Sequence, residues 1–243
     1  MLDARQRPDN LLLTSLPSAE RQRLEPFLKF VELPTGHEIT TPGEPIQALY
    51  FPVNAVNSSV HEMRDGSVIE TGLIGAEGVA GVQLWLRQPT TPAHNFIQIP
   101  GSAWKITASD FIREVRENSA SPLNDLIADY VHAFLVLTSL VAACNRLHSV
   151  EERLCRWLSM VRNRARRSEF SLKQEFLAEM LGVQRPTVSI AAHMLQQAGL
   201  IRYHYGKMTI LNSTGLEEGA CECYRLMESE FDNLSARHSR QAA

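Results

Sequence analysis

The sequence predicts an α+β protein with three parts: an N-terminal antiparallel β-roll, a long helix that we expect to mediate dimerisation, and a C-terminal winged helix-turn-helix. Short β-type runs separated by turn residues fill the chain from Val31 to Ile106. An apolar repeat of helical period follows Pro122. After Ser171 come a helix, a glycine turn, a second helix and a β-hairpin. We expect domains at 10–120, 121–150 and 151–225, with a tail at 226–243.

The composition is that of a globular protein. Of the 243 residues, 44% are hydrophobic and 21% are charged, which excludes disordered and low-complexity classes. We expect no membrane partner, because no stretch approaches the ~20 uncharged apolar residues of a spanning helix. The first residues lack the apolar region of a secretory signal. Four cysteines are too few for a disulfide scaffold, so we expect a cytoplasmic protein with reduced thiols.

Charge is distributed unevenly along the chain. Residues 1–150 hold 11 Lys/Arg and 16 Asp/Glu, a net charge of −5, whereas residues 151–212 hold 10 and 5, a net charge of +5. Residues 213–243 hold 3 Lys/Arg and 6 Asp/Glu, a net charge of −3, so the whole chain has a net charge of −3. A basic segment in an acidic protein suggests that this segment alone binds a polyanion, although a chance fluctuation of surface charge gives the same numbers.

The first two elements are a short helix and the β-roll. Ser18 is placed to cap a helix with Leu24, Phe27 and Leu28 on one face. Short strands with regular turn signals then favour an antiparallel roll or barrel. The pair Asp65–Gly66 lies between two β-type runs and predicts a hairpin.

A long helix is predicted from Ser121–Pro122 to about Val150, because proline is tolerated in a first helical turn. A heptad seam runs along it through eight residues: Leu123, Ile127, Tyr130, Phe134, Leu137, Val141, Cys144 and His148. Such a stripe must be buried against the roll, another chain or both. We expect a parallel helix pair across a dimer two-fold; an internal core helix is the alternative.

An arginine-rich helix and a helix-turn-helix follow. The six arginines of residues 151–168 predict an amphipathic helix with a basic face. Next, Gly182 falls where a tight turn needs positive φ, and Pro186 fits only in the first turn of a second helix. The stretch 201–211 then predicts two strands about a glycine, the wing of a winged helix-turn-helix.

These motifs resemble the cyclic-AMP receptor protein/Fnr (Crp/Fnr) family of bacterial transcription regulators over about residues 10 to 225. The resemblance is carried by LGVQRPTV, AGLI and YGKMTIL, and upstream by LYFP and LIGAEGVAG. It implies a cyclic-nucleotide-binding-like roll as the sensor, a dimerisation helix and a DNA-binding winged helix-turn-helix. The implied partners are a second copy of the chain, a near-palindromic operator in double-stranded DNA, and RNA polymerase.

The resemblance also implies DNA-contacting residues. Arg185 stands where the family places an arginine that contacts guanine, a contact worth roughly 1–3 kcal/mol of discrimination. Gln174 and Thr187 match phosphate-contacting positions, and Gln184 replaces a phosphate-contacting serine. Pro186 and Ile190 replace the family's base-contacting glutamate and second arginine, which predicts a different operator.

Three further positions complete the candidate set. Ser189 and His193, beside Arg185, are candidates for the altered base contacts, although a surface histidine such as His193 is more often only solvated. Lys207 in the wing is a candidate DNA contact.

The sensor lacks the residues of a cyclic-nucleotide site. Gly81 is followed by Val82 instead of glutamate, and Thr91-Pro92-Ala93-His94 occupies the region of the arginine–serine pair that binds the cyclic phosphate. We therefore expect no cyclic-AMP binding. The glycine-rich stretch Gly75–Gly81 lacks dinucleotide-binding spacing and is better explained by turns.

No cofactor, metal site or catalytic activity is expected. The chain has no cysteine before Cys144, so the N-terminal iron–sulfur cluster of the Fnr branch is unsupported. Cys144 and Cys155 are interpreted as small buried hydrophobic residues. Cys221 and Cys223 together provide two ligands, which is too few for a tetrahedral metal site. His148 is interpreted as a paired or solvated histidine rather than a haem ligand. No enzyme motif is present.

Two functions follow from the sequence. The first is a homodimeric, sequence-specific DNA-binding transcription regulator, controlled by an effector or by its abundance alone. The second is a ligand or redox sensor that acts through protein contacts and carries a degenerate DNA-binding module.

Overall fold

The computed structural model describes residues 9–239, so residues 1–8 and the last four residues of the expected tail lie outside it. The chain begins with α1 (Leu11–Thr14), α2 (Ser18–Leu24) and the 3₁₀ turn η2 (Glu25–Phe27). Asn10 caps α1, because its side-chain oxygen accepts hydrogen bonds from Leu12 and Leu13. Its side-chain amide donates to the carbonyls of Pro52 and Gly78, which ties α1 to the roll.

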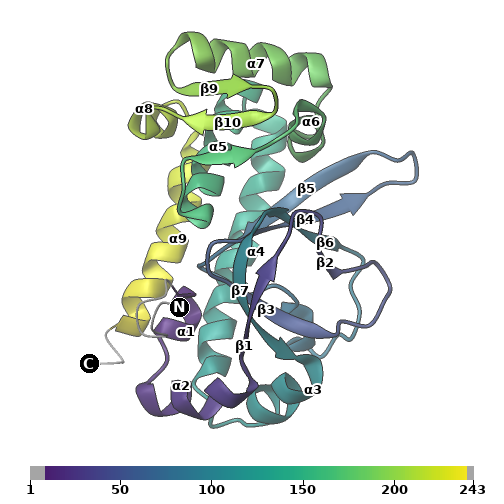
Figure 1. Cartoon of the computed structure of the whole chain (residues 1–243), viewed down its shortest axis with the longest axis vertical. Coiled ribbons are helices and arrows are strands. Elements are labelled where there is room, and N and C mark those ends of the chain that lie inside the picture. The colour runs from purple at the N-terminus through teal and green to yellow at the C-terminus, as the bar shows by residue number, and fades with distance from the viewer. Residues whose placement is uncertain (1–8, 240–243) are drawn as a thin grey trace.

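Two antiparallel sheets form the predicted roll (Figure 1). One sheet has the order β1-β7-β3 and the other the order β2-β6-β4-β5. The strands are β1 (Lys29–Leu33), β2 (Glu38–Thr40), β3 (Ala48–Pro52), β4 (Val56–Glu62), β5 (Val68–Ile74), β6 (His94–Ile99) and β7 (Gly101–Thr107). The 3₁₀ turn η3 (Val82–Leu84) lies between β5 and β6, and α3 (Ala108–Phe111) with the π-helical turn η4 (Ile112–Arg116) leads out of the roll.

The hairpin predicted at Asp65–Gly66 is confirmed. Strands β4 and β5 pair from Asn57↔Ile74 to Glu62↔Val68. Gly66 turns the chain with φ +80°, a value that glycine adopts without steric cost. In Figure 1 this hairpin extends to the right from the roll, below the helix formed by residues 174–181.

The long helix is α4 (Leu123–Leu147), and its apolar seam faces the chain's own core. Ile127, Tyr130 and Leu137 are fully buried. Helix α4 packs against β5, α1 and the C-terminal helix α9 (Glu222–Ser239). The expectation that this seam pairs across a two-fold is therefore wrong: the roll and α9 already cover it, which is the core-helix alternative.

By length and composition α4 is also apolar enough to cross a membrane, with a mean hydropathy of 1.8 over its best window. The sequence-based expectation that the chain has no segment of this kind is therefore wrong for α4. About a third of that window is buried inside the protein, and the buried residues form the seam. Core packing accounts for the apolar character of the seam, and apolar residues outside the seam, such as the exposed Leu135, account for the rest.

Helix α5 (Val150–Ala165) docks the C-terminal half of the chain on the roll. A capping box of Ser149 and Glu152 starts the helix. The indole Nε1 of Trp157 donates to Glu70 Oε1 on β5 at 2.9 Å. The buried guanidinium of Arg164 bonds Glu77 Oε1 at 2.7 Å and Glu228 Oε1 on α9 at 3.3 Å. Roll, α5 and α9 therefore meet at one buried cation.

The expected basic face of α5 is wrong as a surface feature. Arg153, Arg156 and Arg164 are only 5%, 4% and 3% exposed, and Arg162 pairs with Glu217 on α8 (Ser213–Glu218) at 3.1 Å. These arginines lie on the sides of the helix that other elements cover. They hold parts of the protein together and add little charge to its surface.

Two glycines in the stretch between β5 and η3 allow helices to approach closely. A Cβ on Gly78 would lie 2.3 Å from the ring of Tyr130 on α4, and one on Gly75 would lie 2.4 Å from Cβ of Arg164 on α5. Any larger residue would push these helices off the roll. This packing explains why glycine recurs here.

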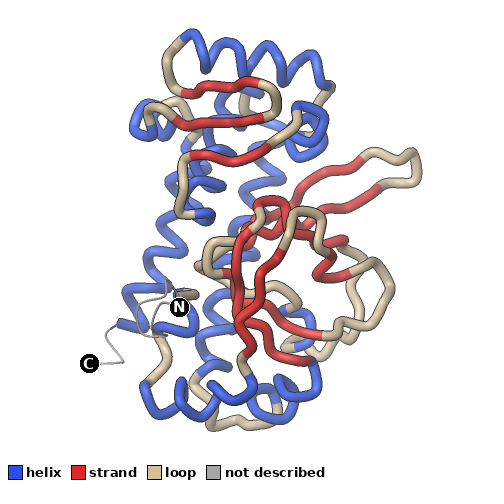
Figure 2. The backbone as a smooth tube through the Cα atoms, viewed as in Figure 1, coloured by secondary structure: helices blue, strands red, loops and turns tan. Residues whose placement is uncertain are grey.

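The remaining elements form the C-terminal region. They are β8 (Glu169–Ser171), α6 (Gln174–Leu181), α7 (Arg185–Gln197), β9 (Ile201–His204) and β10 (Lys207–Ile210), followed by α8 and α9. Figure 2 shows that the strands gather in two separate places, the roll and a small sheet next to α7. Helix α9 returns along α4 and runs through the expected boundary at 225/226 without interruption.

The stability of this arrangement depends on pH through Glu70. Burial raises the pKa of Glu70 from 4.5 to about 7, against the hydrogen bonds of Ser58 and Trp157 and the charges of Arg156 and Arg164. Between these two values the folded chain binds a proton that the unfolded chain has lost. The free energy of unfolding should therefore fall as the pH rises from about 5 to 8.

We predict that Glu70→Gln removes most of this dependence and stabilises the protein at pH 8 by roughly 2–3 kcal/mol, because a neutral amide needs no proton to stay buried. Urea unfolding at pH 5, 6, 7 and 8 measures the effect. Glu62→Gln, on the exposed end of β4, is the matched control and should keep the wild-type slope. Equal slopes for Glu70→Gln and wild type would contradict the assignment.

Candidate nucleic-acid interface

The predicted helix-turn-helix is formed by α6 and α7. Gly182 ends α6 in the left-handed conformation, with φ +61°, as the sequence predicts. Pro186 lies in the first turn of α7, where a missing N–H costs nothing. Buried Leu177 and Leu181 of α6 and Val188 and Leu195 of α7 belong to the core that holds the two helices.

The wing is a three-stranded antiparallel sheet of order β8-β10-β9. Lys207 pairs with His204, so Tyr205 and Gly206 alone form the turn. Both have positive φ, +47° and +73°, as a two-residue type I′ turn requires. Tyrosine is an uncommon choice for the left-handed region, and the Tyr205 side chain is 95% exposed.

Arg185 is the first residue of α7 and its side chain is 62% exposed. Its Nη1 lies 2.9 Å from Oε1 of Glu175, which is also exposed on α6. An exposed ion pair of this kind contributes at most about 1 kcal/mol, so the guanidinium can exchange the carboxylate for another acceptor. Gln184 is the N-cap residue of α7, and Thr187 lies in the first turn; both are exposed.

The structure brings Gln174 and Ser189 together. Gln174 is the first residue of α6, and its Oε1 accepts a hydrogen bond from Ser189 Oγ at 2.9 Å. The Ser189 hydroxyl also lies 3.1 Å from the carbonyl of Arg185. Ser189 is therefore directed towards α6. His193 is exposed one turn further along α7.

Lys207 begins β10 in the wing, and its Nζ lies 2.9 Å from Glu169 Oε2 on β8. The hydrogen bond from Lys207 holds the pKa of Glu169 below its usual value. A groove separates the wing from the helices and is lined by Lys173, Gln174, Glu175, Arg185, Tyr203, His204, Tyr205 and Gly206. The starts of α6 and α7 and the tip of the wing thus face one concavity.

Sequence reasoning missed two exposed side chains. Met194 lies on α7 and is 50% exposed, next to Ile190 at 61%. Tyr205 occupies the wing tip. The spacing of four from Ile190, outside the buried stripe of α7, identifies Met194 as an outward-facing residue. Apolar side chains on a helix of this kind can contact thymine methyl groups.

The surface charge of this region is smaller than the net charge of +5 implies. The exposed cations around the groove and the two helices are Lys173, Arg185, Arg202 and Lys207. They share this surface with three exposed carboxylates, Glu169, Glu175 and Glu179. Arg166 and Arg167, at the end of α5, are also exposed, but they donate to the carbonyls of Asp9 and Pro100 beside the roll. Charge at this end is therefore local to the starts of the helices and to the wing.

The roll presents an uncharged segment where the family's phosphate site is expected. Gly81 has φ +87° and precedes η3, whose residues Val82, Gln83 and Leu84 carry no charge. Thr91 is buried, and its Oγ1 accepts a hydrogen bond from the backbone N–H of Ala93 at 3.1 Å. Neither segment contains an arginine or a lysine.

Comparisons with known proteins agree with this architecture. Residues 152–218 match the family model of the Crp-like helix-turn-helix domain. A transcriptional regulator of the Crp/Fnr family from Eubacterium rectale has a TM-score of 0.64 at 17% identity, covering 86% of this chain and 96% of its own. FixK2 from Bradyrhizobium japonicum has a TM-score of 0.64 at 16% identity, covering 80% and 98%.

A third structure, the c-di-GMP-responsive global regulator CLP of Xanthomonas campestris, has a TM-score of 0.63 at 16% identity and covers 80% of this chain and 99% of its own. Comparison with curated protein sequences gives no significant match. The chain has the fold of Crp/Fnr transcriptional regulators. Its residues 152–218 form a Crp-like helix-turn-helix domain, which confirms the resemblance found in the sequence.

Proposed function

We propose that this protein is a homodimeric, sequence-specific DNA-binding transcription regulator of the cytoplasm. One observation carries the proposal: the segment that matches the Crp-like domain presents Arg185 at the exposed start of α7, beside a groove that ends at the wing. The exposed N-terminus of a recognition helix is the part that reaches base edges in the major groove. The protein acts on promoters with RNA polymerase, and we propose no catalytic activity for it.

In this proposal each side chain has one task. Arg185 leaves Glu175 and binds guanine O6 and N7, while Ile190, His193 and Met194 face the neighbouring bases. Gln174, Gln184, Thr187 and Lys207 bind phosphates. Ser189 fixes the side chain of Gln174, which its hydroxyl already contacts.

We predict that Arg185→Ala lowers the preference for a selected duplex over a random duplex by about 10- to 100-fold, because one bidentate base contact is lost. Lys207→Ala should weaken binding to both duplexes alike and reduce the slope of affinity against salt by about 1. The measurement is fluorescence anisotropy at several salt concentrations, on a duplex selected from a random library with the wild-type protein.

Arg162→Ala is the matched control, because Arg162 pairs with Glu217 away from the groove. Its binding should equal that of the wild type. Uniform weak binding by the wild type, unaffected by Arg185→Ala, would favour the alternative function of a sensor that acts through protein contacts.

The dimer is proposed to form through a stripe of α4 that lies beside the buried seam. Residues at heptad spacing form it: Ala128, Leu135 and Ala142 are exposed, and Val131 and Thr138 are half-buried. Leu135 is 62% exposed at its centre. Two copies related by a two-fold would place their α7 helices for half-sites about 34 Å apart in a near-palindromic operator.

Leu135→Arg should convert the dimer to a monomer at micromolar concentration, because it places two like charges at the helix pair. Sedimentation equilibrium measures the mass. Leu86→Arg replaces an apolar residue that is 47% exposed on the roll and should leave the dimer intact. A wild-type monomer, or equal masses for the two variants, would refute this interface.

We also propose that the roll does not bind cyclic AMP. The segments at Gly81 and Thr91 offer no guanidinium to the cyclic phosphate, and bidentate recognition of an anion is the task of arginine. Isothermal titration calorimetry with cyclic AMP at micromolar concentration should show no saturable heat. Saturable binding would overturn this part of the proposal.

A further inference from the structure

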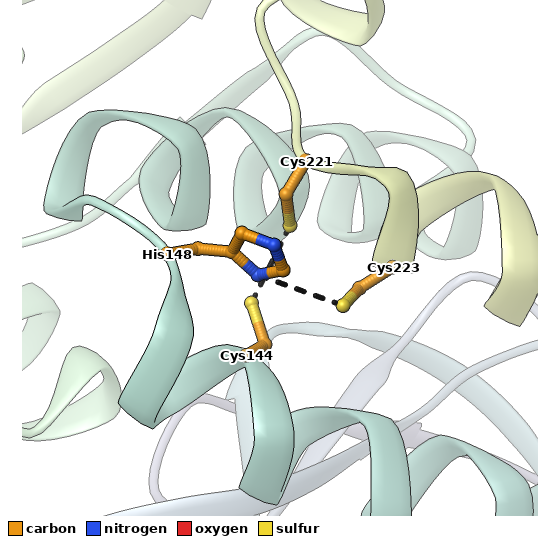
Figure 3. Close-up of side chains that lie close together, drawn as sticks. All are labelled: Cys144, His148, Cys221 and Cys223. Carbon is orange, nitrogen blue, oxygen red and sulfur yellow. Dashed lines mark hydrogen bonds between the residues drawn. The ribbon is translucent and has the colours of Figure 1, made fainter.

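Three cysteines and one histidine meet where α4 ends and α9 begins (Figure 3). Cys144 lies in the last turn of α4, and His148 is its C-cap residue, one turn later. Cys221 directly precedes α9, and Cys223 is in its first turn. Sequence reasoning counted only the pair Cys221 and Cys223, whereas the fold brings the other two ligands to it from more than 70 residues away.

The spacing of these atoms suits one tetrahedral metal ion. One ligand atom from each of the four residues lies within 4.8 Å of the others. The Sγ atoms of Cys144 and Cys221 are 3.4 Å apart, and Cys223 Sγ is 3.7 Å from His148 Nδ1. In a regular tetrahedron about zinc, bonds of about 2.3 Å to sulfur and 2.05 Å to nitrogen give edges of about 3.8 Å and 3.6 Å.

The outer contacts of His148 are those of a ligating histidine. Its Nδ1 faces the thiols, and its Nε2 lies 3.1 Å from the carboxylate of Glu222, which is 73% exposed. A metal-bound histidine usually donates its second N–H to a carboxylate, which fixes the ring and its tautomer. Glu222, between the two cysteines, supplies that partner.

Burial and charge also fit a thiolate site. The side chains of Cys144, Cys221 and Cys223 are 0%, 4% and 3% exposed. Two buried guanidiniums of α5, those of Arg153 and Arg156, interact electrostatically with Cys144, and the charge of Arg156 also acts on Glu70. Zn²⁺ with three thiolates and a neutral imidazole has a net charge of −1, and the carboxylate of Glu222 brings the group to −2, which the two guanidiniums would balance.

We propose that Cys144, His148, Cys221 and Cys223 form a structural zinc site that fastens the start of α9 to the end of α4. The inference is independent of the proposed DNA binding. Zinc is the metal that tetrahedral sites of three thiolates and one imidazole select. The four ligand atoms are too close together to enclose a cluster of several irons, and the thiols are unbonded, because 3.4 Å exceeds a disulfide bond by more than 1 Å.

Zinc binding replaces protons. The thiols of the three cysteines, where still protonated, each lose one proton to solvent as a sulfur–zinc bond forms, and no electron is transferred. The ligand His148 directly precedes Ser149, the N-cap residue of α5. The metal therefore fixes the junction between the long helix and the DNA-binding half.

The test is the metal content of the full chain, purified without oxygen and dialysed against metal-free buffer. We expect one zinc per chain by mass spectrometry of the metal, and the absorption bands of tetrahedral thiolate-bound cobalt after Co²⁺ replaces it. Cys144→Ser should lose at least 100-fold in zinc affinity. Glu222→Gln, an exposed change that leaves the ligands in place, should lose about 10- to 100-fold.

Cys155→Ser is the matched control. Cys155 is also buried, and burial raises the pKa of its thiol to about 11, but it lies outside the four-residue group. It should retain one zinc per chain. Absence of zinc from the wild type, metal content unchanged in Cys144→Ser, or a Cys144–Cys221 disulfide in the anaerobic protein would each overturn the proposal.

Discussion

Burial of one side of α4 is the constraint on which the rest of the structure depends. This helix has a continuous apolar stripe, and the roll, α1 and α9 each cover part of it. The side chain of Tyr130 is packed tightly on two sides. Its ring leaves no room for a side chain at Gly78, and it also lies beside the ring of Phe231 on α9. A core this closely packed fixes the positions of the elements that meet on it.

The same helix links the two functional regions. Its end is followed at once by α5, and α5 is held on the roll by Trp157 with Glu70 and by Arg164 with Glu77. Buried polar contacts of this kind are satisfied in one arrangement and costly in others. These few contacts therefore fix the orientation of α5 on the roll.

Charge has two different roles in this chain. Arg164 on α5 is buried and joins the roll, α5 and α9, whereas Arg185 at the start of α7 and Lys207 in the wing are exposed and paired with surface carboxylates. The first kind is costly to remove, because an unpaired partner would stay buried. The second kind exchanges partners at little cost, which suits groups that must release one acceptor to bind another.

The sequence by itself determined the order of the elements, the hairpin at Asp65–Gly66, the helix-turn-helix with Gly182 and Pro186, and the exposed position of Arg185. Each of these follows from local rules: turn residues that tolerate positive φ, proline in a first turn, and apolar period. Only the tertiary structure decided what covers the seam of α4, which arginines are buried, and that Cys144 and His148 lie beside Cys221 and Cys223. Those outcomes depend on contacts between residues far apart in the chain. Helical or strand periodicity shows which face of an element is buried, but not which other element packs against that face.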